Sequence, residues 1–169
     1  MEYSGSEYSR SEYRRTEYSG SEHSGSEYRR RTPLYELKLE ADSGNLPVLQ
    51  AFIEDHLEAA GCPMKKIPQI SMAAEEVFIN ISSYAYAPSK GDATICMEFV
   101  DRPASVIITF KDHGIPYDPL AKADPDVSLP AEQRKIGGLG IFLTKQVMDD
   151  IAYKYKDGQN ILTMRKSII

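Results

Sequence analysis

The sequence predicts an α/β protein of the α+β kind, a two-layer sandwich with helices on one face of a mixed, mostly antiparallel sheet. Two observations predict this fold class. Five segments have the character of strands, and two pairs of them are joined by short turns, which favours antiparallel pairing. Three longer segments carry apolar residues at helical spacing. With 169 residues, 41% of them apolar, one domain with a substantial core is expected.

The first half of the domain reads as a strand followed by two helices. Residues 34–40 (LYELKLE) alternate as a strand does. Asn45 is expected to cap the next helix, with Pro47 in its first turn and Gly61 at its end. Residues 65–88 are expected to form a second, longer helix. Its predicted core-facing stripe consists of Ile70, Ala73, Ala74, Val77, Ile81 and Tyr84.

The second half reads as two strands, a helix and a hairpin. Residues 92–100 and 104–112 are expected to pair across a tight turn. An apolar helix is predicted over 139–149, and residues 151–168 are expected to form a hairpin that turns at Asp157 and Gly158. The polar, proline-rich stretch from about 114 to 136 is long for a compact domain, and such loops are usually lids or binding segments.

The N-terminal segment is a repeat. Residues 2–31 contain six copies of a five-residue unit, each beginning with Glu, and the six Glu are balanced by six Arg. A period of five fits neither a helix nor a strand, so no continuous face is available for burial. Ordering such a segment costs about 1–2 kcal/mol per residue, and we therefore expect residues 1–32 to be a disordered tail before a domain at 33–169. Its role is left open between a solvated extension and a docking or phosphorylation segment rich in Tyr and Ser.

Composition excludes several classes of protein. The net charge of −5 and the pI of about 5.3 argue against direct nucleic-acid binding. The apolar runs are too short to cross a bilayer, and the N-terminus has no apolar signal region. Cys62 and Cys96 lack metal-ligand spacing and are expected to be small buried side chains in a reducing compartment. We therefore expect a cytoplasmic protein with no membrane partner.

Glu76 and Asn80 form the first candidate motif. They are four residues apart on the second helix, so they are neighbours at the rim of its apolar stripe. One interpretation is a half-exposed polar pair with no further role. The other is a site for chemistry, in which the Asn carbonyl binds Mg²⁺ and the Glu accepts a proton as general base.

Asp112 and Gly114 form the second motif, at the end of an apolar strand. The simpler interpretation is a turn. The functional one is that Asp112 accepts a hydrogen bond from an exocyclic amine, while Gly114 leaves room for a flat ring to lie against the backbone.

Gly137, Gly138 and Gly140 form the third motif, directly before or within the start of an apolar helix. A flexible loop ending at a helix is one interpretation. The spacing fits neither a P-loop nor a dinucleotide fingerprint. The other interpretation is a loop that brings its backbone close to a phosphate chain, because the unpaired N–H groups of a helix N-terminus attract anions.

The order of these motifs resembles the nucleotide site of the GHKL ATPase superfamily, whose fold is the Bergerat ATP-binding fold. The resemblance covers residues 34–168. The segments EEVFINISSYAY, DHGIPYDP and GGLGIFLTKQVMDD are most similar to those of bacterial anti-sigma-factor serine/threonine kinases. That resemblance implies that Asn80 binds Mg²⁺, Glu76 is the base and Asp112 holds adenine. It implies that the other nucleotide-binding positions are Gly114, Gly137, Gly138, Leu139, Gly140 and Ile141.

The resemblance also implies a function. Such kinases bind ATP with Mg²⁺, phosphorylate a Ser or Thr of a small anti-sigma antagonist, and regulate a sigma factor, and a homodimer is expected. Two alternatives stay open: a non-catalytic switch that sequesters a partner when nucleotide is bound, and an interaction domain without nucleotide. One position departs from the family, since Tyr84 stands where many members carry His.

Overall fold

The computed structural model describes residues 12–16, 34–121, 123–124, 128 and 138–169. In these residues six strands form one sheet, in the order β1-β2-β3-β4-β6-β5. Each pairing is antiparallel, so the described sheet is not mixed. The strands are β1 (Glu12–Thr16), β2 (Leu34–Glu40), β3 (Asp92–Asp101), β4 (Ala104–Asp112), β5 (Asp150–Lys156) and β6 (Gln159–Ser167).

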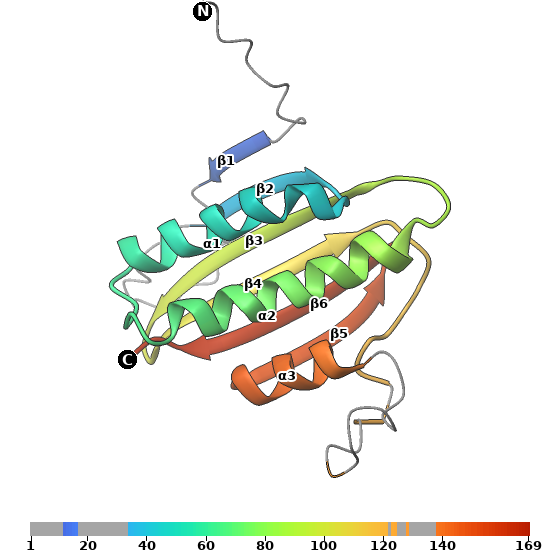
Figure 1. Cartoon of the computed structure of the whole chain (residues 1–169). Helices are drawn as coiled ribbons and strands as arrows, with labels where there is room; N and C mark the ends of the chain where they lie inside the picture. Colours follow the sequence, from blue (N-terminus) through green and yellow to red (C-terminus); the bar gives the residue numbers. More distant parts are fainter. Residues whose placement is uncertain (1–11, 17–33, 122, 125–127, 129–137) are drawn as a thin grey trace, which may run out of the picture.

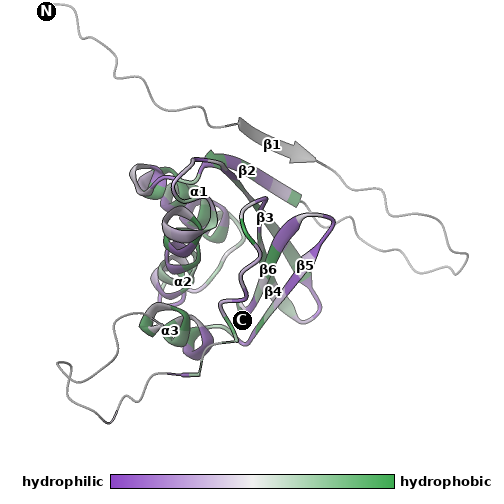
Figure 2. Ribbon diagram, turned by 90° about the vertical axis from the view of Figure 1, so that its right-hand side faces the viewer, coloured by the Kyte–Doolittle hydropathy of each residue, from purple (hydrophilic) through white to green (hydrophobic). Residues whose placement is uncertain are grey.

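The helices of the described residues lie together on one face of this sheet, which confirms the predicted two-layer architecture. They are α1 (Leu46–Ala59), α2 (Ile67–Asn80) and α3 (Leu139–Val147). Figure 1 shows them in front of the strands, with α2 crossing the middle of the sheet. Figure 2, seen from the side, shows the helical layer and the sheet as two separate layers.

The start of α1 differs in detail from the prediction. Asn45 makes no side-chain capping bond; instead its amide donates to the backbone oxygen of Glu40 at 2.9 Å, within a short 3₁₀ turn (Ser43–Asn45). The end of α1 agrees with the prediction. Gly61 follows the helix with a φ of +73°, a conformation that glycine adopts without steric cost.

The second helix continues past α2 as one turn of π-helix, η2 (Ile81–Ala85). The prediction that Tyr84 belongs to the buried stripe is wrong, because its side chain is 57% exposed. A π turn needs more residues than an α turn, so it changes which residues face the core. The remaining members of the predicted stripe are buried: Ile70, Ala73, Ala74, Val77 and Ile81.

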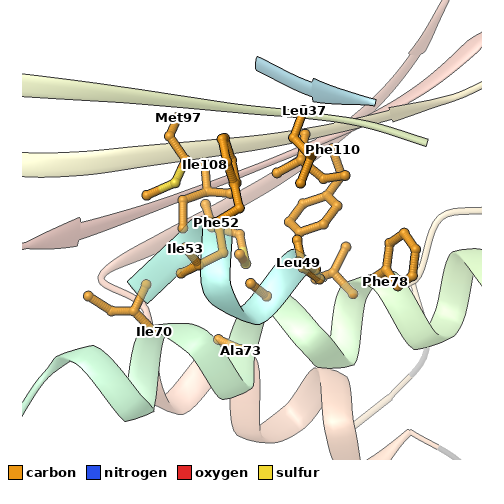
Figure 3. Close-up of a cluster of buried hydrophobic side chains, with 14 of the residues drawn as sticks. Leu37, Leu49, Phe52, Ile53, Ile70, Ala73, Phe78, Met97, Ile108 and Phe110 are labelled. Carbon is orange, nitrogen blue, oxygen red and sulfur yellow. The ribbon is translucent and has the colours of Figure 1, made fainter. Parts of the chain in front are cut away.

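The core lies between the helices and the sheet, as Figure 3 shows. Leu49, Phe52 and Ile53 point from α1 toward the strands, and Ile70 and Phe78 come from α2. The strands contribute Leu37, Met97, Ile108 and Phe110. Burial of each such side chain stabilises the fold by about 1.5–3 kcal/mol before entropy is counted. Cys62 and Cys96 are buried and free, as expected.

The C-terminal hairpin has the predicted turn. Asp157 and Gly158 both have positive φ, of 53° and 75°, as a two-residue hairpin turn of the favoured type requires. Strand β6 then pairs with both β5 and β4. In the register with β4, Asn160 lies directly opposite Asp112. The hairpin therefore brings a second polar side chain to the end of the strand that carries a predicted site residue.

One unit of the N-terminal repeat is part of the sheet. Residues 12–16 form β1 and pair with β2. The rest of the expected tail lies outside the described residues. In the described part of the chain, no helix has the length and apolar character needed to cross a membrane.

Candidate functional site

A pocket opens where the end of the second helix, strands β4 and β6, and α3 meet. It encloses about 450 Å³, including the part open to solvent. Most of its wall is apolar, and Asp112 and Asn160 are among the few polar groups that reach it. Its lining includes Val77, Asn80, Ile81, Tyr84, Phe110, Asp112, Ile115, Tyr117, Ile141, Tyr153, Asn160 and Leu162. An apolar pocket with a few convergent polar groups is typical of a small-molecule site.

Asp112 is the buried acid of this pocket, with 5% of its surface exposed. Its Oδ1 accepts hydrogen bonds from the Gly114 N–H and from the Asn160 amide, both at 2.9 Å. Both of these bonds end on the same oxygen, which leaves Oδ2 available to a ligand. A buried carboxylate with one oxygen committed and one available suits a ligand that donates a hydrogen bond.

Asn160 holds the site together, and the sequence analysis did not find it. Its amide nitrogen donates to Asp112 and to the Ile115 carbonyl oxygen at 3.0 Å. Its side-chain oxygen accepts from the Tyr153 hydroxyl at 2.6 Å and from the Tyr117 N–H at 3.1 Å. Because a buried amide must be satisfied on both ends, Asn160 fixes β4, the following loop and the hairpin relative to one another.

The Tyr153 hydroxyl stays protonated at neutral pH and so keeps its role as donor. Burial raises the pKa of Tyr153 above its usual value, and the negative charges of Asp118 and Asp112 add to the increase. The proton on Tyr153 thereby orients the oxygen of Asn160, and the amide nitrogen is left to face Asp112.

Asn80 lines the same pocket from the last turn of α2. Its amide nitrogen donates back to the Glu76 carbonyl oxygen at 2.8 Å, so Oδ1 is the atom that it can present to a ligand. An amide oxygen is a ligand that Mg²⁺ accepts. One such oxygen fits an ion held mainly by phosphate and water, and among the described residues no cluster of three or more His, Cys, Asp or Glu side chains could hold a metal by itself.

A second, more polar pocket of about 480 Å³ adjoins the first. Asn80, Tyr84, Tyr117 and Ile141 line both. Two further features belong only to the second pocket: Gly138 and an ion pair, in which Lys145 Nζ lies 2.7 Å from Asp124 Oδ1. The two pockets therefore form one elongated site, with a buried acid at one end and Gly138 and Lys145 at the other.

Gly138 precedes α3 as its N-cap residue, with a φ of 92°. A side chain at this φ would be strained, so the sequence needs glycine here. Ile141, two residues into the helix from Leu139, is buried and lines both pockets. Leu139 is 42% exposed and lines neither pocket. Gly137 lies outside the described residues.

Glu76 lies beside the pockets and lines neither of them. Its carboxylate packs against Gly140, where a methyl group would overlap Oε2. Gly140 is therefore small to admit the Glu76 carboxylate at the first turn of α3, where a negative charge is favourable. Glu76 and Gly140 therefore lie against each other, and neither lines the pocket that contains Asp112. Their roles as base and nucleotide contact stay predictions.

Gly114 has a packing role that the sequence analysis did not identify. It does not line either pocket, and a Cβ there would overlap the backbone of Ala85 at the end of η2. The next residue, Ile115, donates its N–H to the Ala85 carbonyl oxygen at 2.9 Å. Gly114 is therefore needed for close backbone packing, and its contact with a flat ring stays a prediction.

Tyr84 and Tyr117 line both pockets, at the place where the pockets join. Their ring centroids are 6.5 Å apart and their planes are inclined by 41°. Tyr117 comes from the loop that follows β4, and Tyr84 from the π turn. A π turn often marks a functional site, because it changes the direction of nearby side chains.

A comparison with protein-family models identifies the class of protein to which this fold and site belong. A model of the histidine kinase-like ATPase domain matches residues 39–166. The chain belongs to this family, which confirms the predicted resemblance to the GHKL superfamily.

Individual proteins resemble the chain over most of its length. The serine-protein kinase RsbW of Bacillus cereus (strain AH820) is 24% identical over 131 residues, which are 75% of this chain and 81% of that protein. RsbW proteins of Bacillus anthracis and Bacillus thuringiensis (strain Al Hakam) match to the same extent. The crystal structure of the RsbU and RsbW domains of Rv1364c from Mycobacterium tuberculosis has a TM-score of 0.58 at 16% identity, covering 82% of this chain and 33% of that one. At that identity the structural likeness supports the shared fold.

Proposed function

We propose that the chain is an ATP-binding serine/threonine protein kinase of the anti-sigma-factor type. One observation carries the proposal: the buried Asp112 carboxylate has one oxygen available, inside an apolar pocket that continues to Asn80 and to the N-terminus of α3. The family match and the similarity to RsbW serine-protein kinases support it.

The apolar pocket would hold the base. Asp112 Oδ2 would accept a hydrogen bond from the exocyclic amine of adenine, and Asn160 would keep the carboxylate in place. The rings of Tyr84 and Tyr117 would contact the nucleotide where the two pockets join. A base with a carbonyl at the position of the amine would place two acceptors against each other, so this end of the site favours ATP over GTP.

The polar pocket would hold the phosphates. Asn80 Oδ1 would be the protein ligand of Mg²⁺, an ion that supplies charge neutralisation for the phosphate chain. The N-terminus of α3 and Lys145 would add positive potential from the protein. Phosphates would compete with Asp124 for the Lys145 ammonium, because both are anions within its reach.

The acceptor would be a Ser or Thr of a small anti-sigma antagonist, and the nucleotide-bound chain would also bind a sigma factor. The resemblance of the sequence to anti-sigma-factor kinases implies these partners, and the description of the relatives as serine-protein kinases supports a Ser acceptor. For phosphotransfer, Glu76 would have to accept the proton of the incoming hydroxyl. Its carboxylate lies at the first turn of α3, next to Gly140, close to the proposed phosphate end of the site.

The position of Glu76 also favours a second candidate function. Because this carboxylate lines neither pocket, the site can bind nucleotide without a base in contact with it. The chain would then be a nucleotide-dependent switch that sequesters a partner without phosphorylating it.

Transfer of label from [γ-³²P]ATP to an anti-sigma antagonist protein tests the two functions. A kinase transfers label, and Glu76→Gln reduces the rate by about 10²–10⁴-fold while ATP binding is retained. Glu75→Gln, which alters the neighbouring carboxylate, is the matched control and keeps the rate. ATP binding without any transfer supports the switch, and the absence of ATP binding rules out both.

A further inference from the structure

Four apolar side chains are exposed on the helices α2 and α3, which are neighbours on the same face of the sheet (Figures 1 and 2). The four side chains are each between 36% and 42% exposed, and they are Met72, Ile79, Leu139 and Leu143. A single exposed apolar residue is ordinary, whereas a group of them in one place marks an interaction surface. We call these four residues the α2–α3 surface.

Helical spacing places each pair on the outer side of its helix. Met72 and Ile79 of α2 are seven residues apart, which is close to two turns, so they share a face. Leu139 and Leu143 of α3 are four apart and share a face for the same reason. The buried residues of both helices, such as Ile141, belong to the core between helices and sheet. Both exposed pairs therefore lie on the side away from the sheet.

The Glu76 carboxylate lies within the α2–α3 surface. Met72, Glu76 and Ile79 have the spacing i, i+4 and i+7, so the carboxylate lies between the two apolar side chains of α2. On the other side Glu76 packs against Gly140, in the first turn of α3 and between its two exposed Leu residues in the sequence. A group that approaches Glu76 from solvent therefore meets exposed apolar side chains on both helices.

The charges at this surface are negative. Glu75 and Glu76 are the charged residues of α2, and neither makes an ion pair with another residue that the structure describes. The cation of α3, Lys145, pairs with Asp124 and lines the second pocket instead. Carboxylates without a cation beside an apolar surface favour a partner that carries Lys or Arg next to apolar side chains, and they disfavour an acidic one.

We propose that the α2–α3 surface binds the segment of the acceptor protein that carries the Ser or Thr. That segment has apolar side chains next to its hydroxyl residue, and Lys or Arg at its flanks. The inference rests on the proposed function and adds the chemistry by which the acceptor is recognised. It also accounts for the position of Glu76 outside both pockets, because the carboxylate then faces the acceptor.

Fluorescence anisotropy with the full chain tests the docking. The probe is a short labelled peptide with a central Ser between Leu residues and with Lys at both ends. Met72→Gln and Leu143→Gln each replace an apolar contact by a neutral polar side chain that suits a helix, and we expect the dissociation constant to rise about fivefold or more. Met64→Gln, at a methionine that is 74% exposed outside this surface, is the matched control and keeps the affinity.

Two results overturn the docking surface. One is a peptide that does not bind to the natural chain. The other is equal binding by the natural chain, Met72→Gln and Leu143→Gln, each confirmed as folded by its unfolding transition.

The charge argument has its own arm. The same peptide with Glu in place of Lys should bind about tenfold more weakly at low salt, and the difference should shrink as salt is added. Equal binding of the two peptides overturns the choice of a basic partner.

Sedimentation velocity of the chain alone tests a second copy as the occupant. The natural chain and Met72→Gln should sediment alike. A smaller species in Met72→Gln would assign the surface to contact between copies and overturn its assignment to the acceptor. The proposed function fails by a different readout, since peptide binding without ATP binding or label transfer contradicts the kinase while the docking surface stands.

Discussion

The amide nitrogen of Asn160 lies 2.9 Å from Oδ1 of Asp112, across the β4–β6 pairing. This bond joins residues 48 positions apart and determines which carboxylate oxygen faces the pocket. The side-chain oxygen of Asn160 accepts hydrogen bonds from the Tyr117 N–H and the Tyr153 hydroxyl. The proposed base-binding end of the site therefore depends on a residue that need not contact the nucleotide.

Replacing Asn160 with Ala should affect nucleotide binding and stability together. Asp112 loses a donor and Tyr153 loses an acceptor, so we expect about 1–3 kcal/mol less stability. ATP affinity should fall by about tenfold or more, because the carboxylate is no longer held. Calorimetric titration and urea unfolding measure the two effects. Gln159→Ala, one residue earlier on β6, is the control, and an equal loss of affinity there would contradict the role of Asn160.

Replacing Gly114 with Ala tests the close approach to η2. The added methyl group overlaps the Ala85 backbone, and the bond from Ile115 to Ala85 must lengthen or break. We expect a loss of about 1–3 kcal/mol in the free energy of unfolding. His113→Ala, at the exposed neighbouring position, should cost much less. If the two variants unfold at the same urea concentration, the backbone contact is not what requires glycine.

Replacing Asn80 with Ala should remove the dependence of ATP binding on Mg²⁺. Alanine keeps the helix and removes the oxygen offered to the metal, together with the amide that donates to the Glu76 carbonyl oxygen. Titrations with Mg²⁺ and with a chelator should differ by about tenfold for the natural chain and should coincide for the variant. Asn80→Asp keeps an oxygen at this place and should keep the difference. An undiminished Mg²⁺ effect in Asn80→Ala would show that the ion binds elsewhere.

Asp149 makes the stability of the fold depend on pH in the acidic range. Its Oδ1 lies 2.8 Å from Lys166 Nζ, and its Oδ2 accepts from the Ser167 N–H at 2.6 Å. The hydrogen bond with Lys166 and then the bond from Ser167 lower the pKa of Asp149. Because the folded pKa lies below the unfolded value of about 4, the carboxylate stabilises the fold above that pH and loses its contribution as the pH falls through the folded value.

Asp149→Asn should therefore lower the melting temperature at pH 7, by an amount equivalent to about 0.5–1 kcal/mol for this partly exposed pair. The difference from the natural chain should shrink as the pH falls below about 4. Thermal unfolding from pH 7 to pH 2.5 measures it. A difference that stays constant over this range would mean that the charge of Asp149 does not contribute.

The fold could be predicted, and three residues that line the two pockets were singled out, because their signals are local. Alternation, helix stripes and the Asp157-Gly158 turn each lie within one short segment. Asn80, Asp112 and Gly138 were found by their place at the end or start of such elements. The prediction failed for Tyr84 because a π turn shifts the helical phase, which a constant angle per residue does not represent.

The rest of the site depends on contacts between distant segments. Asn160 becomes a site residue only through the register of β4 with β6, and Gly114 is constrained by Ala85, which lies on another element. Strand β1 pairs with β2, from which it is separated in the sequence. A period of five residues contains no information about that pairing.

Calorimetric titration of ATP into the full chain, compared with Asp112→Asn, tests the central claim most directly. The account predicts that the natural chain binds one ATP per chain in the presence of Mg²⁺, with a preference over GTP. It predicts that Asp112→Asn, confirmed as folded by its unfolding transition, loses that binding because an amide replaces the available carboxylate oxygen. Equal ATP binding by the two proteins would contradict the assignment of this pocket to adenine.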